Sequence, residues 1–284
     1  MSVCGSSAPL TSISAGRFCG RIGTRRQFPK IGATGAGKVP PQQLIQVVEA
    51  AAQTGAKFVM EAVNKPRNVA YKGLTDLVTD TDKSSEEAIL EVLCCFGGCL
   101  YRGKPAAASV VEFVGGPMCW NTRMFSATSG GGAFCNGRKI HVSQTDQVER
   151  SLLVTGFGYE HDEAWATNIE LFKQFTDVSR GVRRLGAAAV DMCHVALGIV
   201  EAYWEYRLKP WDMAAGVLIV EEAGGAVSRM DGEGFCVFDR SVLVSNNVIH
   251  SKLLERIAPA TENLKNNGTD FSLWFKPDKY RTDL

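Results

Sequence analysis

Acidic residues are missing from the start of this sequence, because no Asp or Glu precedes Glu49. The same stretch holds six basic residues, namely Arg17, Arg21, Arg25, Arg26, Lys30 and Lys38. It also lacks the continuous apolar core of a secretory signal. A basic, Ser-rich and acid-free leader is typical of an organelle transit peptide, whereas an ordinary disordered N-terminus is the alternative. We expect residues 1–40 to be a transit segment, and the early serines favour the chloroplast over the mitochondrion.

Long apolar runs and a surplus of basic charge are also missing. Charged residues or glycines interrupt every apolar stretch well before the roughly 20 residues that span a bilayer. The whole chain has 31 basic and 30 acidic residues, so removing the basic leader leaves an acidic remainder. Such a remainder lacks the basic surface of a nucleic-acid-binding protein. We therefore expect neither a membrane nor a nucleic acid among its partners.

The composition excludes a disordered chain, and the cysteine spacing disfavours a structural zinc site. With 45% hydrophobic and 21% charged residues, the chain is too apolar for disorder and too poor in charge for a coiled coil. Its nine cysteines include no Cys-x-x-Cys spacing, which structural zinc sites commonly use. The class that remains is a folded globular protein with a substantial hydrophobic core.

Apolar periodicity predicts alternating helices and strands in that body. We expect a helix after Pro40 that runs through Met60, and a second helix capped by Ser84 and Glu87. Strands are predicted at 108–114, 123–127 and 132–135, with an Asn-Gly turn at 136–137 into a strand at 139–142. The second half should alternate strands at 151–155, 202–206, 226–229 and 241–245 with helices at 164–175, 187–198, 213–223 and 252–257. This order predicts a layered α/β or α+β fold, either one unit or two closely joined halves.

Carboxylates occur in places that suit a hard cation or an activated water. Asp76, Asp80 and Asp82 precede the second predicted helix, although one of them could simply cap it. Asp212 follows a strand and begins a helix, where stabilisation by the helix dipole is the structural alternative. Glu205 lies in a predicted strand and could point to solvent or to a ligand. These patterns leave the structural and functional interpretations open.

Several segments occur in the order of a known family. They are residues 77–82 (LVTDTD), 186–188 (GAA), 211–216 (WDMAAG) and 221–225 (EEAGG), within a likeness from about Gln43 to Glu255. This pattern resembles the inositol monophosphatase family. With the basic leader and the aromatic tail at 271–275, the chain is similar to the plant chloroplast members. The resemblance implies a layered sugar-phosphatase domain over residues 41–265 and a tail at 266–284, which we expect to dock on the body.

The resemblance also implies an activity and a cofactor. Members are Mg²⁺-dependent phosphomonoesterases that hydrolyse inositol 1-phosphate or a similar small polyol or sugar phosphate, and homodimers are usual. By motif position, Asp212 would bind Mg²⁺ and also lie near the substrate. Asp82 would orient the attacking water, with Asp76 and Thr79 in support.

The substrate side of the implied site lies in the second half of the chain. Glu205 would hydrogen-bond the hydroxyl groups of the polyol. The same pocket would be lined by Gly186, Ala187 and Ala188. Inositol, galactose and histidinol phosphates all remain possible substrates at this point, because relatives with these motifs act on each of them.

Two diagnostic segments of the family are absent from the sequence. Neither Gly-Glu-Glu nor Asp-Pro-x-Asp-Gly-Thr occurs, although both would lie between residues 93 and 100. The chain reads CCFGGC at 94–99, while both flanks match the family, which indicates an internal deletion. The missing segments supply most metal carboxylates and some central strands. We therefore expect little or no phosphatase activity and a sheet that either exposes an edge or pairs again. An inactive splice form or an incorrect gene structure is the alternative to a working phosphatase.

Overall fold

The structure of the chain is a computed structural model that describes residues 41–66, 68–71, 77–94, 100–101, 104–116 and 119–274. The predicted transit segment, Asp76 and residues 95–99 lie outside this part. None of the helices within it is both long enough and apolar enough to cross a membrane.

An antiparallel sheet and two helices form the first half of the described chain. α1 (Pro41–Ala62) packs against α2 (Asp80–Cys94), and the buried Ser85 hydroxyl donates to Gly55 O at 3.3 Å. The sheet has the order β5 (Ala107–Gly116), β6 (Cys119–Thr128), β7 (Gly132–Cys135) and β8 (Arg138–Lys139). Two short antiparallel pairs complete this half: β1 (Val69–Tyr71) with β2 (Leu77–Thr79), and β3 (Leu100–Tyr101) with β4 (Lys104–Pro105).

A mixed five-stranded sheet lies at the centre of the second half. Its order is β10 (Gly181–Arg183), β9 (Leu152–Thr155), β11 (Ala202–Tyr206), β13 (Ser241–Ser245) and β12 (Ala226–Ser228). β9 pairs in parallel with β10 and β11, whereas β13 runs antiparallel to β11 and β12. The helices are α3 (Glu163–Val178), α4 (Ala188–Ala196), α5 (Pro210–Glu222) and α6 (His250–Asn266), with a single 3-10 turn at Val148–Arg150.

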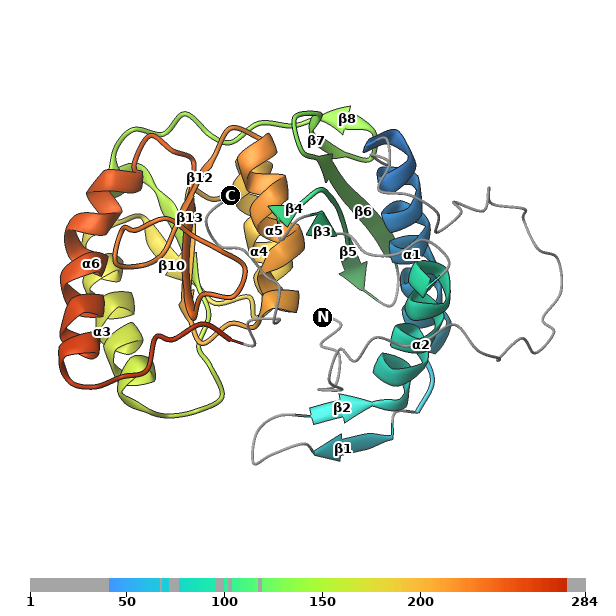
Figure 1. The fold of residues 1–284 in the computed structure, drawn as a ribbon, viewed down its shortest axis with the longest axis horizontal. Coiled ribbons are helices and arrows are strands. Elements are labelled where there is room, and N and C mark those ends of the chain that lie inside the picture. The colour runs from blue at the N-terminus through green and yellow to red at the C-terminus, as the bar shows by residue number, and fades with distance from the viewer. Residues whose placement is uncertain are drawn as a thin grey trace, which may run out of the picture.

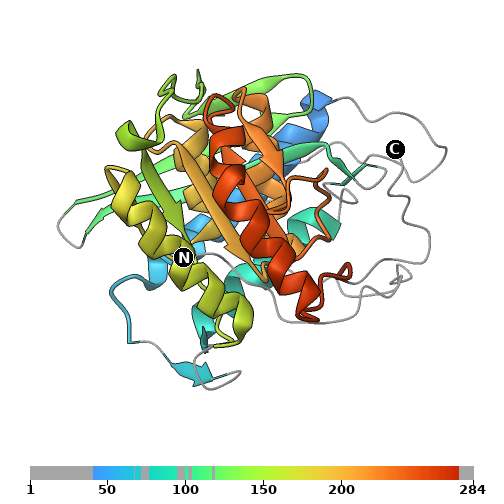
Figure 2. The same cartoon turned by 90° about the vertical axis from the view of Figure 1, so that its left-hand side faces the viewer.

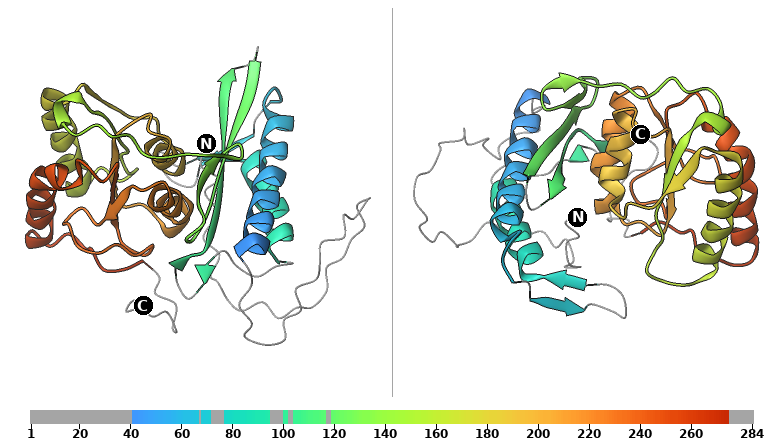
Figure 3. Two further views of the ribbon diagram at one scale, coloured as in Figure 1. Left: turned by 90° about the horizontal axis from the view of Figure 1, so that it is seen from above. Right: turned by 180° about the vertical axis from the view of Figure 1, so that it is seen from behind.

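The elements stack in layers (Figures 1 and 3). α1 and α2 cover one side of the antiparallel sheet, and α4 and α5 lie between its other side and the mixed sheet. α3 and α6 lie side by side on the outer face of the mixed sheet (Figure 2). The predicted layered α/β fold is therefore confirmed, and the central helix pair joins the two halves.

The central helix pair is closely packed because α5 carries a glycine where it meets α4. A Cβ built on Gly216 would lie 2.5 Å from Met192 Sδ and 2.8 Å from Met192 Cβ. Met192 is fully buried, so its side chain has no room to withdraw. Gly216 thus serves the packing of α5 against α4.

Several predicted bounds are wrong at the ends of elements. The second helix begins at Asp80 rather than Ser84, because Thr79 and Asp82 form its cap: Asp82 Oδ2 accepts from Thr79 N at 2.7 Å. The strand after the Asn136–Gly137 turn ends at Lys139 instead of residue 142. α6 runs past its predicted end and contains Pro259, because Leu264 is still buried against the core.

Three short strands escape prediction altogether. β1, β2 and β10 have three residues each and show no alternation in the sequence, whereas the equally short β12 is predicted because Gly224 and Gly225 mark the end of the preceding helix. β11 and β13, by contrast, match their predicted bounds, since each is a continuous buried run.

The C-terminal tail contacts the body through Trp274. Its backbone N–H donates to Phe238 O at 2.8 Å, and its indole Nε1 donates to Leu208 O at 2.8 Å. The ring lies between Lys209 Nζ, 3.0 Å from the ring centroid, and the Arg240 guanidinium carbon, 3.6 Å from it. Because Lys209 precedes α5, the tail holds the turn that leads to the helix start. The domain bounds at 41–265 and 266–284 stay predictions.

Candidate active site

Glu205 is a buried carboxyl group on the central strand β11. It is 8% exposed, and its Oε2 accepts a hydrogen bond from the Tyr203 hydroxyl. The pKa of Glu205 is raised to about 8, chiefly by burial and then by the carboxylates of Asp212 and Asp191, against the lowering effect of the Tyr203 bond. A carboxyl group in this state holds a proton at neutral pH, so it can donate a hydrogen bond as well as accept one. Of the two predicted orientations, the structure excludes the solvent-facing one.

Gly156 makes the space that Glu205 occupies, and the sequence reasoning did not identify it. A Cβ at Gly156 would lie 1.8 Å from Glu205 Oε2. Gly156 is held in place by Asn168 of α3, whose Nδ2 donates to Gly156 O at 2.7 Å and whose Oδ1 accepts from Trp204 Nε1 at 2.7 Å. A glycine directly after a buried strand is the signal that could have found it.

Asp212 lies in the first turn of α5 beside Glu205. It is 9% exposed, and its Oδ2 accepts a hydrogen bond from Lys209 N at 2.9 Å. Pro210 starts the helix, where its missing N–H costs nothing. Burial is the main cause of the raised pKa values of Tyr203 and Glu205, and the Asp212 charge adds to both. The capping role expected of Asp212 is therefore present, and its proposed metal role stays a prediction.

Asp191 is a second buried carboxyl group that the sequence reasoning missed. It is 1% exposed, and neither carboxylate oxygen has a hydrogen-bond partner within the described residues. Burial, more than any neighbouring charge, raises its pKa to about 7. Its presence in the otherwise apolar run between Val190 and Met192 is the signal that could have revealed it.

The predicted substrate segment leads into α4 one turn before Asp191. Gly186 is exposed with φ +88°, and an added Cβ would meet no atom within 4 Å. Ala187 flanks the helix start and makes no side-chain capping bond, while Ala188 is buried. Small side chains thus leave the start of α4 without a side-chain cap, which suits the approach of a polar ligand.

The predicted catalytic residues of the first half form a separate unit. Asp82 Oδ2 accepts from Thr79 N at 2.7 Å and from Thr79 Oγ1 at 2.9 Å. No hydrogen bond or ion pair joins Thr79 or Asp82 to Glu205 in the part of the chain that is described. α2 belongs to the helix pair on one side of the antiparallel sheet, whereas α5 lies on the other (Figure 1). Asp76 lies outside the described residues.

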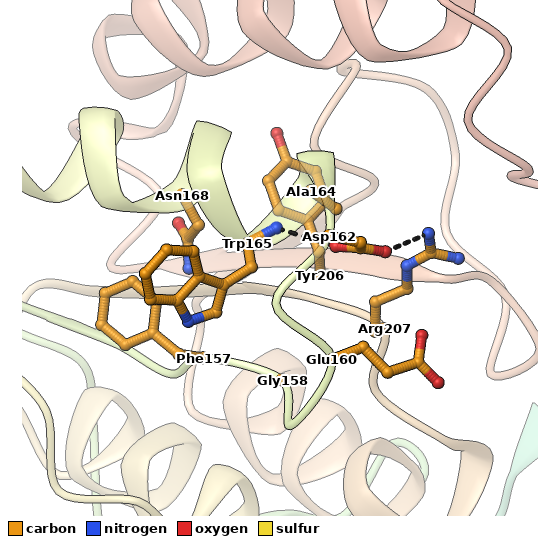
Figure 4. Close-up of a pocket in the computed structure, with 9 residues that line it drawn as sticks. All are labelled: Phe157, Gly158, Glu160, Asp162, Ala164, Trp165, Asn168, Tyr206 and Arg207. Carbon is orange, nitrogen blue, oxygen red and sulfur yellow. Dashed lines mark hydrogen bonds and ion pairs between the residues drawn. The ribbon is translucent and has the colours of Figure 1, made fainter.

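A small pocket opens near the end of β11, but it contains none of the predicted site residues (Figure 4). Arg207 Nη2 pairs there with Asp162 Oδ2 at 2.5 Å, and Asp162 Oδ1 accepts from Trp165 N at 3.0 Å. Its volume of about 10 Å³ suffices for no more than a water molecule. A sugar phosphate needs several hundred Å³, so this pocket is not the substrate site.

The described residues do not assemble a site for a divalent cation. Across these residues, no group of three or more His, Cys, Asp and Glu side chains is arranged to hold a metal ion. Asp212 uses one oxygen as a helix cap, and Asp191 is enclosed. Mg²⁺ requires near-octahedral oxygen ligands at about 2.0–2.1 Å. The cation implied by the resemblance therefore does not fit the residues that are described.

The layered α/β fold is that of solved inositol monophosphatase structures. The inositol monophosphatase family model matches residues 97–266, and the chain belongs to this family. The family is one of phosphatases, as expected from the sequence motifs. The match begins at residue 97, within the CCFGGC sequence at 94–99.

Individual relatives agree with this assignment. Phosphatase IMPL1, chloroplastic, of Arabidopsis thaliana is 66% identical over 307 residues, which cover 93% of this chain and 83% of that protein. The inositol-1-monophosphatase of Synechocystis is 32% identical over 256 residues, covering 74% of this chain and 86% of that protein. The inositol monophosphatase structure from Anabaena has a TM-score of 0.62 and 27% identity, covering 77% of this chain and 96% of that chain.

The contact between Gly156 and Glu205 predicts a position-specific loss of stability. Gly156→Ala should lower the free energy of unfolding by about 1–3 kcal/mol, because the new Cβ displaces the buried carboxyl group. Gly158→Ala is the matched control, since an added Cβ there meets Arg207 Cβ at an ordinary 3.7 Å. Urea unfolding of the two variants measures the difference. Equal losses at both positions would show that Glu205 does not occupy this space.

The raised pKa of Glu205 predicts that stability falls as pH rises. The folded pKa of about 8 exceeds the ordinary value of 4.5, so the folded chain binds more protons between these pH values. The free energy of unfolding should decrease between about pH 5 and pH 8, with Asp191 adding to the slope. Glu205→Gln should reduce this dependence of the free energy of unfolding on pH. At pH 8 the variant should have the higher free energy of unfolding, by on the order of a few kcal/mol at most.

Urea unfolding at pH 5 and pH 8 measures the slope. Glu170→Gln is the control, because Glu170 is exposed on α3 and should leave the slope unchanged. An undiminished slope in Glu205→Gln would refute the assignment of this titration to Glu205.

Proposed function

We propose that the chain derives from a Mg²⁺-dependent phosphomonoesterase that hydrolyses inositol 1-phosphate, or a similar small polyol or sugar phosphate, to the free alcohol and phosphate. The buried Glu205 carboxyl group, held by Tyr203 beside Asp212, is the observation that carries this proposal. The names of the Synechocystis and Anabaena relatives support inositol phosphates as the substrate class.

The second half of the chain would bind the alcohol part of the substrate. Glu205 would exchange hydrogen bonds with polyol hydroxyl groups, and the Tyr203 hydroxyl would keep its carboxyl group in one orientation. Gly186, Ala187 and Ala188 would line the same pocket, where the small side chains leave room for a ring. The starts of α4 and α5 would favour the negative charge of a phosphate through their backbone N–H groups.

The metal-binding half of the site is incomplete in this proposal. In the intact enzyme Mg²⁺ would hold the phosphate and supply an activated water, and Asp212 would be one of its ligands. The alignment with the Arabidopsis relative is 307 residues long, which exceeds the 284 residues of this chain. Positions without a counterpart here therefore occur in it, which supports a lost internal segment near residues 94–99. Asp82, with Asp76 and Thr79, would orient a water only together with that segment.

Phosphate release from inositol 1-phosphate, with and without Mg²⁺, tests both parts of the proposal. The purified 284-residue chain should release phosphate at or near background, because one carboxylate binds Mg²⁺ weakly. A chimaera that carries the corresponding segment of the Arabidopsis relative between Cys94 and Leu100 should regain Mg²⁺-dependent release. Asp212→Asn in that chimaera should abolish the gain.

The two parts of the proposal fail in different ways. Turnover by the original chain as fast as by the chimaera would contradict an incomplete metal site. A folded chimaera that hydrolyses neither inositol 1-phosphate nor galactose 1-phosphate would contradict the substrate class.

We also propose that the chain is directed to the chloroplast. The acid-free basic leader supports this location, as does the chloroplastic Arabidopsis relative. Residues 1–40 fused to a fluorescent protein should bring fluorescence into plastids of plant cells. A fusion in which Arg17, Arg21, Arg25 and Arg26 are changed to Glu is the control and should remain outside. Fluorescence in mitochondria would overturn the assignment.

A further inference from the structure

Asn168 is a buried polar residue of α3, the helix that packs on the outer face of the mixed sheet. It is 2% exposed, and its side-chain amide makes three hydrogen bonds. Nδ2 donates to Gly156 O at 2.7 Å and to Thr155 Oγ1 at 3.1 Å, and Oδ1 accepts from Trp204 Nε1 at 2.7 Å. The amide therefore joins the end of β9 to β11.

The chemistry of its partners fixes the orientation of this amide. Trp204 Nε1 can only donate, so it must face Oδ1, and Gly156 O can only accept, so it must face Nδ2. The Thr155 hydroxyl completes the network, because it accepts from Asn168 Nδ2 and donates to Trp204 O at 2.7 Å. A flipped amide would lose both of the 2.7 Å bonds, so the buried network has one arrangement.

Gly156 lies beside Glu205 when the register of β9 and β11 is continued. The parallel ladder ends with Thr155 opposite Trp204, so the next step along both strands places Gly156 opposite Glu205. Since side chains alternate between the faces of a sheet, a side chain at position 156 would share the face of Glu205. The 1.8 Å between a Cβ at Gly156 and Glu205 Oε2 agrees with this register.

The bond from Asn168 holds Gly156 where the ladder has ended. β9 stops at Thr155, and Gly156 is the first residue beyond it. The Glu205 carboxyl group fills the space beside Gly156 and accepts from the Tyr203 hydroxyl. A shift of Gly156 toward Glu205 would displace the carboxyl group, and a shift away from it would admit water. A side chain on the outer face thus acts on a carboxyl group on the inner face.

We propose that Asn168 is a positioning residue for Glu205. It fixes Gly156 and Trp204, and through them the orientation of the carboxyl group that would bind the polyol. The polyol part rests on the proposed function of Glu205, whereas control over the carboxyl group rests on the contacts alone. A purely structural asparagine would stabilise the packing of α3 without determining the state of Glu205.

Infrared spectroscopy of the full 284-residue chain tests this control. The pKa of about 8 leaves Glu205 protonated at pH 6, so the difference between the unmodified chain and Glu205→Gln identifies its carbonyl band. Asn168→Leu keeps a similar side-chain volume and removes all three hydrogen bonds. In this background we expect the Glu205 band to shift in frequency and to weaken, because Gly156 O must find another donor and water reaches the carboxyl group.

Leu171→Ala is the matched control for a general loss of stability. Leu171 is 1% exposed on the same helix and belongs to the core beneath it. Its truncation should lower the stability of the chain and leave the Glu205 band in place, because an apolar side chain holds neither Gly156 nor Trp204 by a hydrogen bond.

Hydrogen exchange in the unmodified chain decides the matter if Asn168→Leu does not fold. The side-chain amide protons of Asn168 should exchange far more slowly than those of Asn267, which is exposed at the end of α6. Equal exchange rates at the two positions would mean that the network does not persist in solution.

A titration with myo-inositol, followed by nuclear magnetic resonance, separates positioning from the proposed function. The unmodified chain and Leu171→Ala should bind it equally, and Asn168→Leu should bind it about tenfold more weakly. If the unmodified chain binds no inositol, the proposed role of Glu205 fails, and the infrared band still decides the positioning.

Three further results would overturn the inference. An unchanged Glu205 band in Asn168→Leu would show that the carboxyl group does not depend on the amide. An equal change in Leu171→Ala would assign the effect to loosened packing of α3. A shifted band with unchanged inositol affinity would separate the orientation of Glu205 from binding.

Discussion

The burial of β11 in the middle of the mixed sheet is the constraint on which the rest of the structure depends. Strands flank it on both sides and helices cover both faces, so all five of its residues are buried. Alternation sends Tyr203 into the core beside α4 and α5 and Trp204 into the core beside α3 and α6. Glu205 shares the face of Tyr203, and its carboxyl group is therefore desolvated, bonded to that tyrosine and raised in pKa.

The burial of the Glu205 carboxyl group restricts which residues can surround it. Gly156 is required because any Cβ would enter the volume of the Glu205 carboxyl group. Gly216 is required because α4 and α5 must meet closely to cover the same face. Trp274 holds the turn before Asp212, because its indole Nε1 donates to Leu208 O and its ring makes a cation–π contact with Lys209. Segments far apart in the chain thus maintain one arrangement of acids.

The described carboxylates fall into two groups in different parts of the molecule. Asp82 serves with Thr79 as a helix cap, and the described residues gather no group of side chains that could hold a metal ion. Glu205, Asp191 and Asp212 are buried on β11, α4 and α5. α2 and α5 lie on opposite sides of the antiparallel sheet, so the fold keeps the two groups apart.

The sequence by itself determined the family, the layered fold class and most of the strands and helices, because these follow from local periodicity and from ordered motifs such as residues 211–216. It also indicated that Asp82 could be a cap, whereas the common site of Glu205 and Asp212, implied by the family motifs, stays a prediction. The sequence could not reveal the roles of Gly156 and Asp191. The space that Gly156 leaves for the Glu205 carboxyl group, and the burial of the Asp191 carboxylate without a hydrogen-bond partner among the described residues, both depend on residues far away in the chain. The start of α2 was misplaced because the sequence offers two possible caps, and the structure uses Thr79 with Asp82 rather than Ser84. Whether Glu205 faced water or the interior was decided only by the strands and helices that close around β11, because burial is a property of packing rather than of sequence.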